Sequence, residues 1–161
     1  GYATGFFGHW GVGPRNRAAP LVSAAAAQVV TPADQRGGFA HWEGWAGGFQ
    51  LNDPWLHGDG CAEPTRVLGY QSDVLGARAL AWWQATTAAP APAPARAPRF
   101  ALVSYDAPHP PYAAPVSPGT PPTPTAEALT LPADVPRGGE VEARARRELA
   151  GYYAHLAATD A

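Results

Sequence analysis

The stretch Phe100-Ala101-Leu102-Val103-Ser104-Tyr105 is a continuous, mostly apolar run, bounded by Pro98 and by Asp106-Ala107-Pro108. A run of this length between such boundaries is typical of a strand buried on both faces. The segment before it, from Ser72 to about Ala85, is typical of a helix, with Ser72 as the N-cap and Asp73 in the first turn. A helix followed by a buried strand is half of a β-α-β unit. These residues therefore predict an α/β fold.

The rest of the chain predicts further elements around this core. Residues 2–7 favour a short buried strand because Tyr, Thr and Phe prefer strands, and the glycines after them favour a tight loop. The alanine-rich residues 21–30 predict a short helix, and residues 31–60 read as loops that carry aromatic side chains. The alternating alanine and proline of residues 86–98 predict a stiff connector.

A second long helix is predicted from Glu140 to Thr159, where apolar residues recur at helical spacing. Glu140 with Arg144, and Glu142 with Arg146, stand four residues apart in the favourable order for ion pairs. In the first helix, the residues predicted to face the core are Val74, Leu75, Leu80, Trp82 and Trp83.

Composition limits the function classes that need to be considered. The chain has 161 residues, 46% of them hydrophobic, with 18 glycines and 19 prolines, so one domain rich in turns is expected. The formal charge is −2, and arginines and acids are interleaved, which excludes a dedicated nucleic-acid binder. No apolar run has the roughly 18 residues needed to cross a bilayer. The chain contains neither lysine nor methionine.

Two histidines follow directly on predicted strands. His9 comes after Thr4-Gly5-Phe6-Phe7-Gly8, and His109 comes shortly after Tyr105. In open α/β sheets, ligands bind beyond the carboxyl ends of the strands, so these two side chains are expected to converge on one anionic group. An imidazole can hydrogen-bond an anion, carry positive charge beside it, or protonate a leaving group. A purely structural role for each histidine is the alternative.

Five blocks of sequence, taken together and in order, resemble the sulfatase family. Gly1-Tyr2-x-Thr4-x-x-x-Gly8-His9-Trp10-x-Val12-Gly13 is similar to the family signature Gly-Tyr-x-Thr-x-x-x-Gly-Lys-Trp-His-Leu-Gly. Ala107-Pro108-His109-x-Pro111-Tyr112 matches its Ala-Pro-His-x-Pro-aromatic motif. The three other blocks are Gly37-Gly38-Phe39-Ala40-His41-Trp42-x-Gly44, Gly69-Tyr70-Gln71-Ser72-Asp73-Val74-Leu75 with Arg78-Ala79-Leu80, and Leu149-Ala150-Gly151-Tyr152-Tyr153-Ala154.

The resemblance implies a sulfuric ester hydrolase with an alkaline-phosphatase-like mixed sheet flanked by helices, only partly represented in this chain. It implies that residues 1–161 are the central part of a catalytic domain. His109 matches the family's substrate-contacting histidine, and His9 stands at the family's lysine. Both are therefore candidate catalytic and substrate-binding residues. The family also uses a formylglycine nucleophile and Ca²⁺, and both are expected outside this chain.

The first signature departs from the family at two positions. His9 replaces a lysine, so its charge depends on pH near about 6.5, unlike that of a lysine. Gly11 replaces a histidine and has no side chain to take its place. Two alternatives to the sulfatase hypothesis stay open. The departures favour a catalytically impaired, sulfatase-like binding protein, and the similar anion sites of the superfamily leave a hydrolase of phosphate or phosphonate esters as the other alternative.

The remaining candidate residues favour structural roles. Cys61 is the single cysteine, and Cys61-Ala62-Glu63-Pro64-Thr65-Arg66 is one residue too long for the family's Cys-x-Pro-x-Arg modification motif, so an ordinary loop thiol is predicted. Asp34, Asp53, Asp59 and Asp106 are interpreted as turn and cap residues. The tryptophans within residues 42–55 are interpreted as a packed cluster, with a sugar or aryl pocket as the alternative.

The sequence thus predicts part of an enzyme that acts on a sulfated small molecule or glycan, without a nucleic-acid partner or a membrane span. The absence of methionine at position 1, and of a glycine cap after the last helix, is expected if a longer protein has been cut at both ends. On that hypothesis the two strands lack sheet partners, and low stability of the isolated chain is expected.

Overall fold

The computed structural model describes residues 1–88 and 98–161. Most of the predicted connector at 86–98 lies outside the described residues. The chain divides into two compact units, Gly1–Asp106 and Ala107–Ala161, and each is described by itself.

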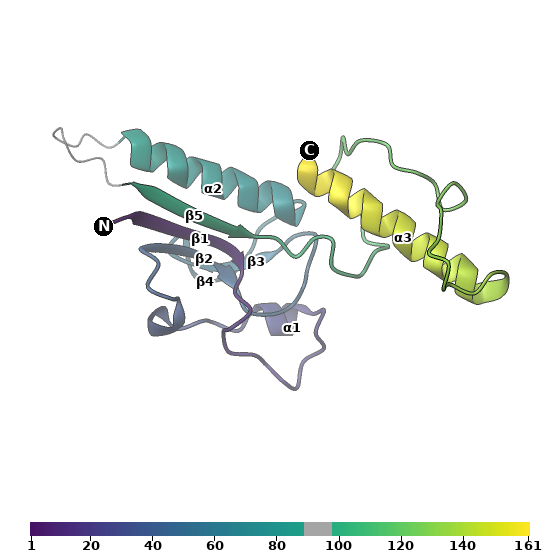
Figure 1. Ribbon diagram of the computed structural model, residues 1–161. Helices are drawn as coiled ribbons and strands as arrows, with labels where there is room; N and C mark the ends of the chain where they lie inside the picture. Colours follow the sequence, from purple (N-terminus) through teal and green to yellow (C-terminus); the bar gives the residue numbers. More distant parts are fainter. Residues whose placement is uncertain (89–97) are drawn as a thin grey trace. The chain divides into compact units, whose positions relative to one another are not determined.

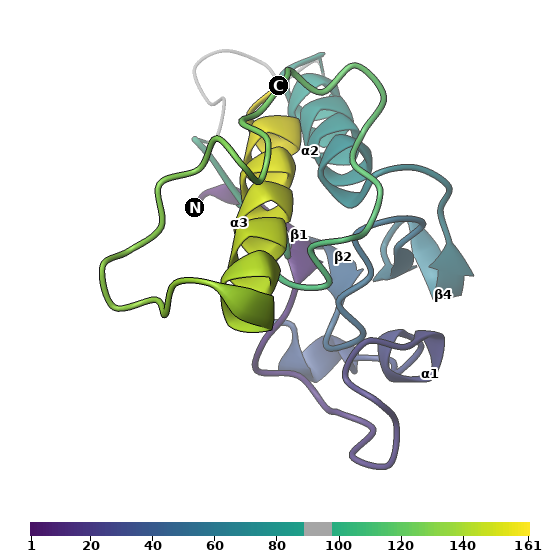
Figure 2. The same cartoon turned by 90° about the vertical axis from the view of Figure 1, so that its right-hand side faces the viewer.

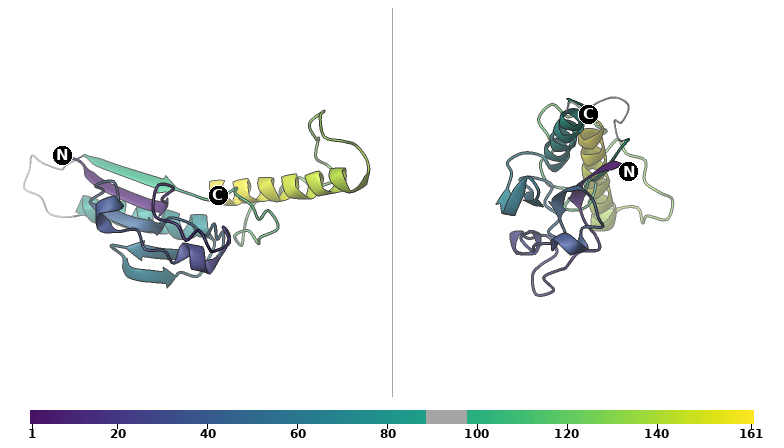
Figure 3. Two further views of the ribbon diagram at one scale, coloured as in Figure 1. Left: turned by 90° about the horizontal axis from the view of Figure 1, so that it is seen from below. Right: turned by 90° about the vertical axis from the view of Figure 1, so that its left-hand side faces the viewer.

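Within the described residues, the first unit is built on a five-stranded mixed sheet (Figure 1). The strands are β1 (Ala3–His9), β2 (His41–Trp45), β3 (Trp55–Gly58), β4 (Cys61–Arg66) and β5 (Arg99–Ser104). Their order across the sheet is β4-β3-β2-β1-β5. Strand β1 pairs in parallel with β2 and with β5, and Figure 3 shows β1 and β5 side by side. The β2–β3 and β3–β4 pairs are antiparallel. The α/β class is therefore confirmed.

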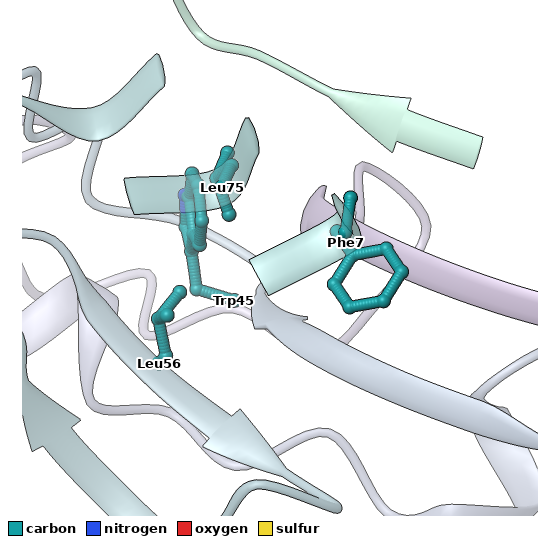
Figure 4. Packing of buried hydrophobic residues seen from close by; sticks show 5 residues of the cluster. Phe7, Trp45, Leu56 and Leu75 are labelled. Atoms are coloured by element: carbon teal, nitrogen blue, oxygen red, sulfur yellow. The ribbon is translucent and has the colours of Figure 1, made fainter. Parts of the chain in front are cut away.

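Helix α2 (Gln71–Ala88) covers one face of this sheet (Figure 2). Because β4 precedes the helix and β5 follows it, α2 carries the chain from one edge of the sheet to the other. Apolar side chains from the sheet and the helix form the core, namely Phe7, Trp45, Leu56, Leu75 and Ala79 (Figure 4). At least 91% of the surface of each is buried, so the transfer of these side chains from water is the main force that holds α2 in place.

The other face is covered by an irregular segment that contains two short helices, α1 (Ala24–Ala27) and the 3₁₀ helix η1 (Ala33–Gln35). An aromatic cluster fills this face. The ring of Phe6 stacks on Trp42 at 5.7 Å between centroids and meets Trp10 edge-on at 4.8 Å. Trp42 is buried in this cluster and Trp45 in the core under α2, so the tryptophans do not form the single packed loop cluster that was expected.

Three expectations about the strands are wrong. Residues 31–60 contain β2 and β3 in addition to loops, and Cys61 opens β4 instead of lying in a loop. The two predicted strands do not lack partners, because β1 is central and β5 pairs with it from Ala3↔Arg99 to Gly8↔Ser104. Short runs such as His41–Trp45 mix glycine and a charged residue with tryptophan, and so lack the alternation that identifies a strand from sequence.

The stretch that predicts the fold is a strand, but it is not buried on both faces. β5 lies at the edge of the described sheet, and the side chains of Phe100 and Leu102 are 48% and 38% exposed. An apolar run is thus equally compatible with an edge strand, and sequence alone does not distinguish the two positions.

The helix boundaries also differ from the predictions. α2 begins at Gln71, so Ser72 lies in its first turn and is not the N-cap, and the helix extends to Ala88. Leu80 and Trp83 are exposed, contrary to the prediction for the buried side of α2. The helix predicted at residues 21–30 is confined to Ala24–Ala27, with Ser23 accepting a hydrogen bond from Ala26 N–H as N-cap.

The second unit is organised around helix α3 (Gly139–Asp160). Arg146 pairs with Glu142 at 2.7 Å, as predicted, and it also donates to the carbonyl oxygens of Ala126 and Leu129 in the preceding irregular segment. The predicted Glu140–Arg144 pair is wrong. Glu140 pairs with Arg147 and Arg144 with Glu148, because the exposed side chains select other acidic and basic partners along the helix.

His57 in β3 predicts a pH-dependent stability. Its ring is fully buried beside Trp42, and its Nε2 accepts a hydrogen bond from the Thr31 backbone N–H at 2.8 Å. Burial, with a smaller contribution from the charge of Arg36, lowers the pKa of His57 to about 4.

Protonation of His57 is disfavoured in the folded protein but not in the unfolded chain. The contribution of the neutral ring to the free energy of unfolding is therefore complete above pH 6.5 and is lost as the pH falls toward 4. We expect the free energy of unfolding to drop by up to about 3 kcal/mol over this range. His57→Gln keeps a hydrogen-bond acceptor but has no titrating ring. In urea titrations, its free energy of unfolding should therefore fall over the same pH range by about 3 kcal/mol less than that of the wild type. Equal pH profiles for the two proteins would contradict this assignment.

Candidate functional site

The carboxyl ends of β1, β2 and β5 meet at one edge of the sheet, because the three strands run in the same direction. His9 is the last residue of β1, Asp106 follows β5 after one intervening residue, and Gln71 begins α2 at the same edge. Of these three residues, sequence analysis identified only His9 as a site residue. Figure 1 shows the end of β5 and the start of α2 next to each other.

Gln71 holds Asp106 through two hydrogen bonds. Its Nε2 donates to Asp106 Oδ2 at 2.9 Å, and its Oε1 accepts from the Asp106 backbone N–H at 2.8 Å. The same Nε2 also donates to the carbonyl oxygen of Gln50 at 2.9 Å. Both Gln71 and Asp106 are buried. This reciprocal pairing fixes the position of a carboxylate that burial would otherwise disfavour.

The imidazole of His9 lies between aromatic rings and next to this carboxylate. It is parallel to Trp45 at 6.4 Å between centroids and meets the edge of Phe49 at 5.0 Å. Its Nδ1 is 3.2 Å from Asp106 Oδ1, close enough for an ion pair, although the two groups are not aligned as a hydrogen bond. In catalytic sites such alignment is often reached only when the substrate is bound.

The other ring nitrogen of His9, Nε2, decides what the imidazole could bind. Nε2 is buried and has no hydrogen-bond partner among the described residues. A buried polar atom without a partner costs about 1–3 kcal/mol, but Trp42 Nε1 and His57 Nδ1 in the core are in the same state, so burial alone does not identify a ligand site. The position of His9 at the carboxyl end of β1 is what favours one. With Nδ1 directed to the carboxylate of Asp106, Nε2 is the nitrogen that remains for a ligand.

The interpretation of Asp106 as a turn residue is wrong, because its side chain is buried and bonded to Gln71. Gln71 lies in the block Gly69-Tyr70-Gln71-Ser72-Asp73, and the resemblance implied no role for it. A signal was nevertheless present for Asp106. It is a carboxylate that follows a strand of the parallel group, where α/β sheets place their ligand sites.

His109 belongs to the second unit and lies between two cis prolyl bonds, Ala107–Pro108 and Pro110–Pro111. Its Nδ1 is 2.7 Å from the carbonyl oxygen of Pro110, which requires Nδ1–H to be the donor. The convergence of His9 and His109 on one anion stays a prediction.

Gly11 lies in a turn after β1 and is exposed, with no atom within 4 Å of the position that a Cβ would occupy. The space that a side chain would need is therefore present, but no other described imidazole in this unit replaces the missing one. His41 pairs with Glu43 at 3.0 Å, and His57 is committed to Thr31.

The implied cofactors do not fit the described residues. Ca²⁺ requires about six to eight oxygen ligands. Among residues 1–88 and 98–161, no three His, Cys, Asp or Glu side chains gather in an arrangement that could hold a metal ion. Cys61, the residue type from which formylglycine is made, lies in β4, three strands away from β1. No step is assigned to Ca²⁺ or formylglycine here.

A second charged cluster lies within the core of the first unit. Glu43 of β2 is buried and accepts hydrogen bonds from His41 and from Arg78 of α2. Burial raises the pKa of Glu43, but the bond to His41 and the charge and bond of Arg78 outweigh it and hold the pKa below its ordinary value. Because both carboxylate oxygens of Glu43 are bonded within this cluster, we interpret it as structural.

Comparison with known proteins gives no assignment, since no family model and no curated protein matches the sequence significantly. Within the part of the chain that the structure describes, no helix is both long and apolar enough to cross a membrane.

Proposed function

We propose that this chain forms part of a sulfuric ester hydrolase of the alkaline-phosphatase-like superfamily and supplies part of its sulfate site. The observation that carries the proposal is the position of His9 at the carboxyl end of β1, 3.2 Å from the buried carboxylate of Asp106. The five ordered sequence blocks support the same assignment. The mixed sheet, with a helix on one face, is compatible with that fold.

In this proposal His9 binds a sulfate oxygen through Nε2. Asp106 and Gln71 act as positioning residues, because the two hydrogen bonds between them fix the carboxylate 3.2 Å from His9 Nδ1. When His9 carries a proton at both nitrogens, it offers charge and a hydrogen-bond donor to the developing negative charge of the transition state. His109 keeps the role that the resemblance implies, which is contact with the sulfated substrate.

The partner is a sulfated small molecule or a sulfated glycan. In the superfamily, formylglycine supplies the nucleophile and Ca²⁺ supplies positive charge. Both are assigned to parts of the protein beyond the described residues.

The test is the hydrolysis of 4-nitrophenyl sulfate by the full-length protein. We expect turnover, and we expect His109→Ala to lower kcat/KM by about 10²–10³-fold, the effect of removing one group that stabilises transition-state charge. Asp134→Ala, at an exposed position in the same unit, is the matched control and should retain the wild-type rate. Absence of turnover, or a His109→Ala variant with wild-type kinetics, would contradict the proposal.

One observation favours a second candidate, a sulfatase-like protein that binds sulfated or phosphorylated ligands without turnover. Gly11 stands where the family has a histidine, and no other described imidazole of the first unit takes its place. Such a protein binds 4-nitrophenyl sulfate in calorimetry and releases no nitrophenol. An ester hydrolase for phosphonates instead turns over an aryl phosphonate faster than the aryl sulfate.

A further inference from the structure

A cleft with a volume of about 370 Å³ lies in the first unit, in the loops that follow β1 and β2. Arg15, Asn16 and Arg17 line one side, and Gly47, Gly48 and Phe49 line another. Apolar residues of the segment that contains α1, such as Leu21 and Ala26, complete the lining. A volume in the range of about 300–1,000 Å³ with a few polar groups on an apolar lining is typical of a small-molecule site.

The charge in this cleft is of one sign. Two arginines and no acidic residue line it, although the chain as a whole carries a formal charge of −2. Arg15 donates to the carbonyl oxygen of Gly11 at 3.2 Å, and neither Arg15 nor Arg17 is within ion-pair distance of a carboxylate in the described segments. Guanidinium groups without an acidic partner are suited to carboxylates and sulfates, which they bind through two parallel hydrogen bonds.

Phe49 connects the cleft to His9. Its ring lines the cleft and lies 5.0 Å from the imidazole of His9. The next residue, Gln50, accepts a hydrogen bond from Gln71, the residue that holds Asp106. Phe49 has a φ of 32°, in the left-handed region that residues other than glycine seldom adopt. Strained backbone of this kind persists where the surrounding structure imposes it, and it is frequent at ligand sites.

The loop before Phe49 packs closely against helix α1. Gly48 has a φ of 104°, and a Cβ at this position would lie 2.5 Å from the Cβ of Ala27. The loop after β2 therefore reaches α1 only because residue 48 is glycine. This close approach joins the loop that carries Phe49 to the α1 segment, and both line the cleft together with Arg15 and Arg17.

We propose that this cleft binds a second anionic group of the substrate, so that the substrate class is a saccharide with two acidic groups. One sulfate ester lies at Nε2 of His9, and a second sulfate or a carboxylate lies between Arg15 and Arg17. The sugar ring extends past Phe49, whose apolar ring offers a stacking surface. This inference rests on the proposed function and adds to it a preference for doubly charged saccharides over singly charged sulfate esters.

The test compares two matched sugars, N-acetylglucosamine 6-sulfate with one anion and N-sulfoglucosamine 6-sulfate with two, as ligands of the full-length protein. We expect the disulfated sugar to bind at least about tenfold more tightly, because a hydrogen bond to a charged group contributes enough for such a factor. In the variant Arg15→Ala/Arg17→Ala this preference should fall to less than about twofold. Calorimetry gives Kd, and KM is measured wherever turnover occurs.

The control is Arg144→Ala/Arg147→Ala, which removes two exposed arginines from α3 and so changes the net charge equally. It should keep the wild-type preference. Galacturonic acid 2-sulfate replaces the second sulfate by a carboxylate, and a wild-type preference for it over N-acetylglucosamine 6-sulfate identifies the carboxylate as an acceptable group.

The outcomes separate the two proposals. If the protein hydrolyses 4-nitrophenyl sulfate but binds the mono- and disulfated sugars equally, the cleft assignment is wrong and the hydrolase assignment stands. If it prefers the disulfated sugar through Arg15 and Arg17 but turns over no ester, the cleft is supported and the hydrolase is overturned. If it neither binds nor hydrolyses these ligands, both are overturned.

Discussion

Gly44→Ala is expected to destabilise the first unit by about 3 kcal/mol or more, a large part of the stability of an ordinary domain. Gly44 of β2 pairs with Gly8 of β1, and a Cβ at residue 44 would lie 2.2 Å from the carbonyl oxygen of Gly8. The obstacle is backbone in the middle of a parallel strand pair, so no side-chain rotation relieves it. The strands must separate or shift, which would also displace the neighbouring His9.

Urea titration followed by tryptophan fluorescence measures this loss. Gly11→Ala is the matched control, because a Cβ at residue 11 meets nothing within 4 Å. We expect its free energy of unfolding to stay within about 0.5 kcal/mol of wild type. If Gly44→Ala were as stable as Gly11→Ala, the pairing of β1 with β2 in this register would be wrong.

Arg78→Met is expected to cost about 3 kcal/mol at pH 7, because it leaves the buried carboxylate of Glu43 without one of its two partners. Arg78 reaches from α2 to Glu43 in β2, so the pair connects the helix to the sheet. The double variant Glu43→Gln/Arg78→Met removes the buried charge together with its partner. It should recover most of the lost stability, as buried ion pairs often do when both members are replaced.

The pH dependence gives a second readout. In the wild type the pKa of Glu43 is below its ordinary value, so its contribution is present above about pH 4.5 and is lost as the pH falls through the lowered value. Arg78→Met removes a charge and a bond that lower the pKa of Glu43, so this pKa rises in the variant. The loss in the free energy of unfolding caused by the variant should therefore shrink as the pH is lowered toward 5. A cost that is independent of pH, or a double variant as unstable as the single one, would contradict this account.

The sequence predicted the class of the fold because its clearest signals are local. The long helices and the strands around Phe7 and Val103 each carry their own pattern of apolar residues. Strands β2, β3 and β4 were missed because their pairing, not their composition, makes them strands. Cys61–Arg66, for example, is polar and largely exposed, and it contains a proline.

The candidate site was predicted only in part, for a related reason. His9 was predicted as a site residue because it follows a strand, and the resemblance of residues 1–13 to the sulfatase signature supported this prediction. Gln71 and Asp106 are 35 residues apart and acquire a role only when β5 and the start of α2 meet. The arginine-lined cleft depends on a left-handed Phe49 and on the close approach of Gly48 to Ala27, which no local pattern reveals.

The most direct test of the proposed function is the initial rate of hydrolysis of 4-nitrophenyl sulfate, compared with an aryl phosphonate, by the full-length protein and its His9→Ala variant. We predict that the sulfate ester is the faster substrate and that His9→Ala lowers its kcat/KM by about 10²-fold or more, with an unchanged thermal unfolding midpoint. Release of no nitrophenol from the sulfate ester, or equal rates for wild type and His9→Ala, would contradict the assignment of a sulfuric ester hydrolase with His9 at its sulfate site.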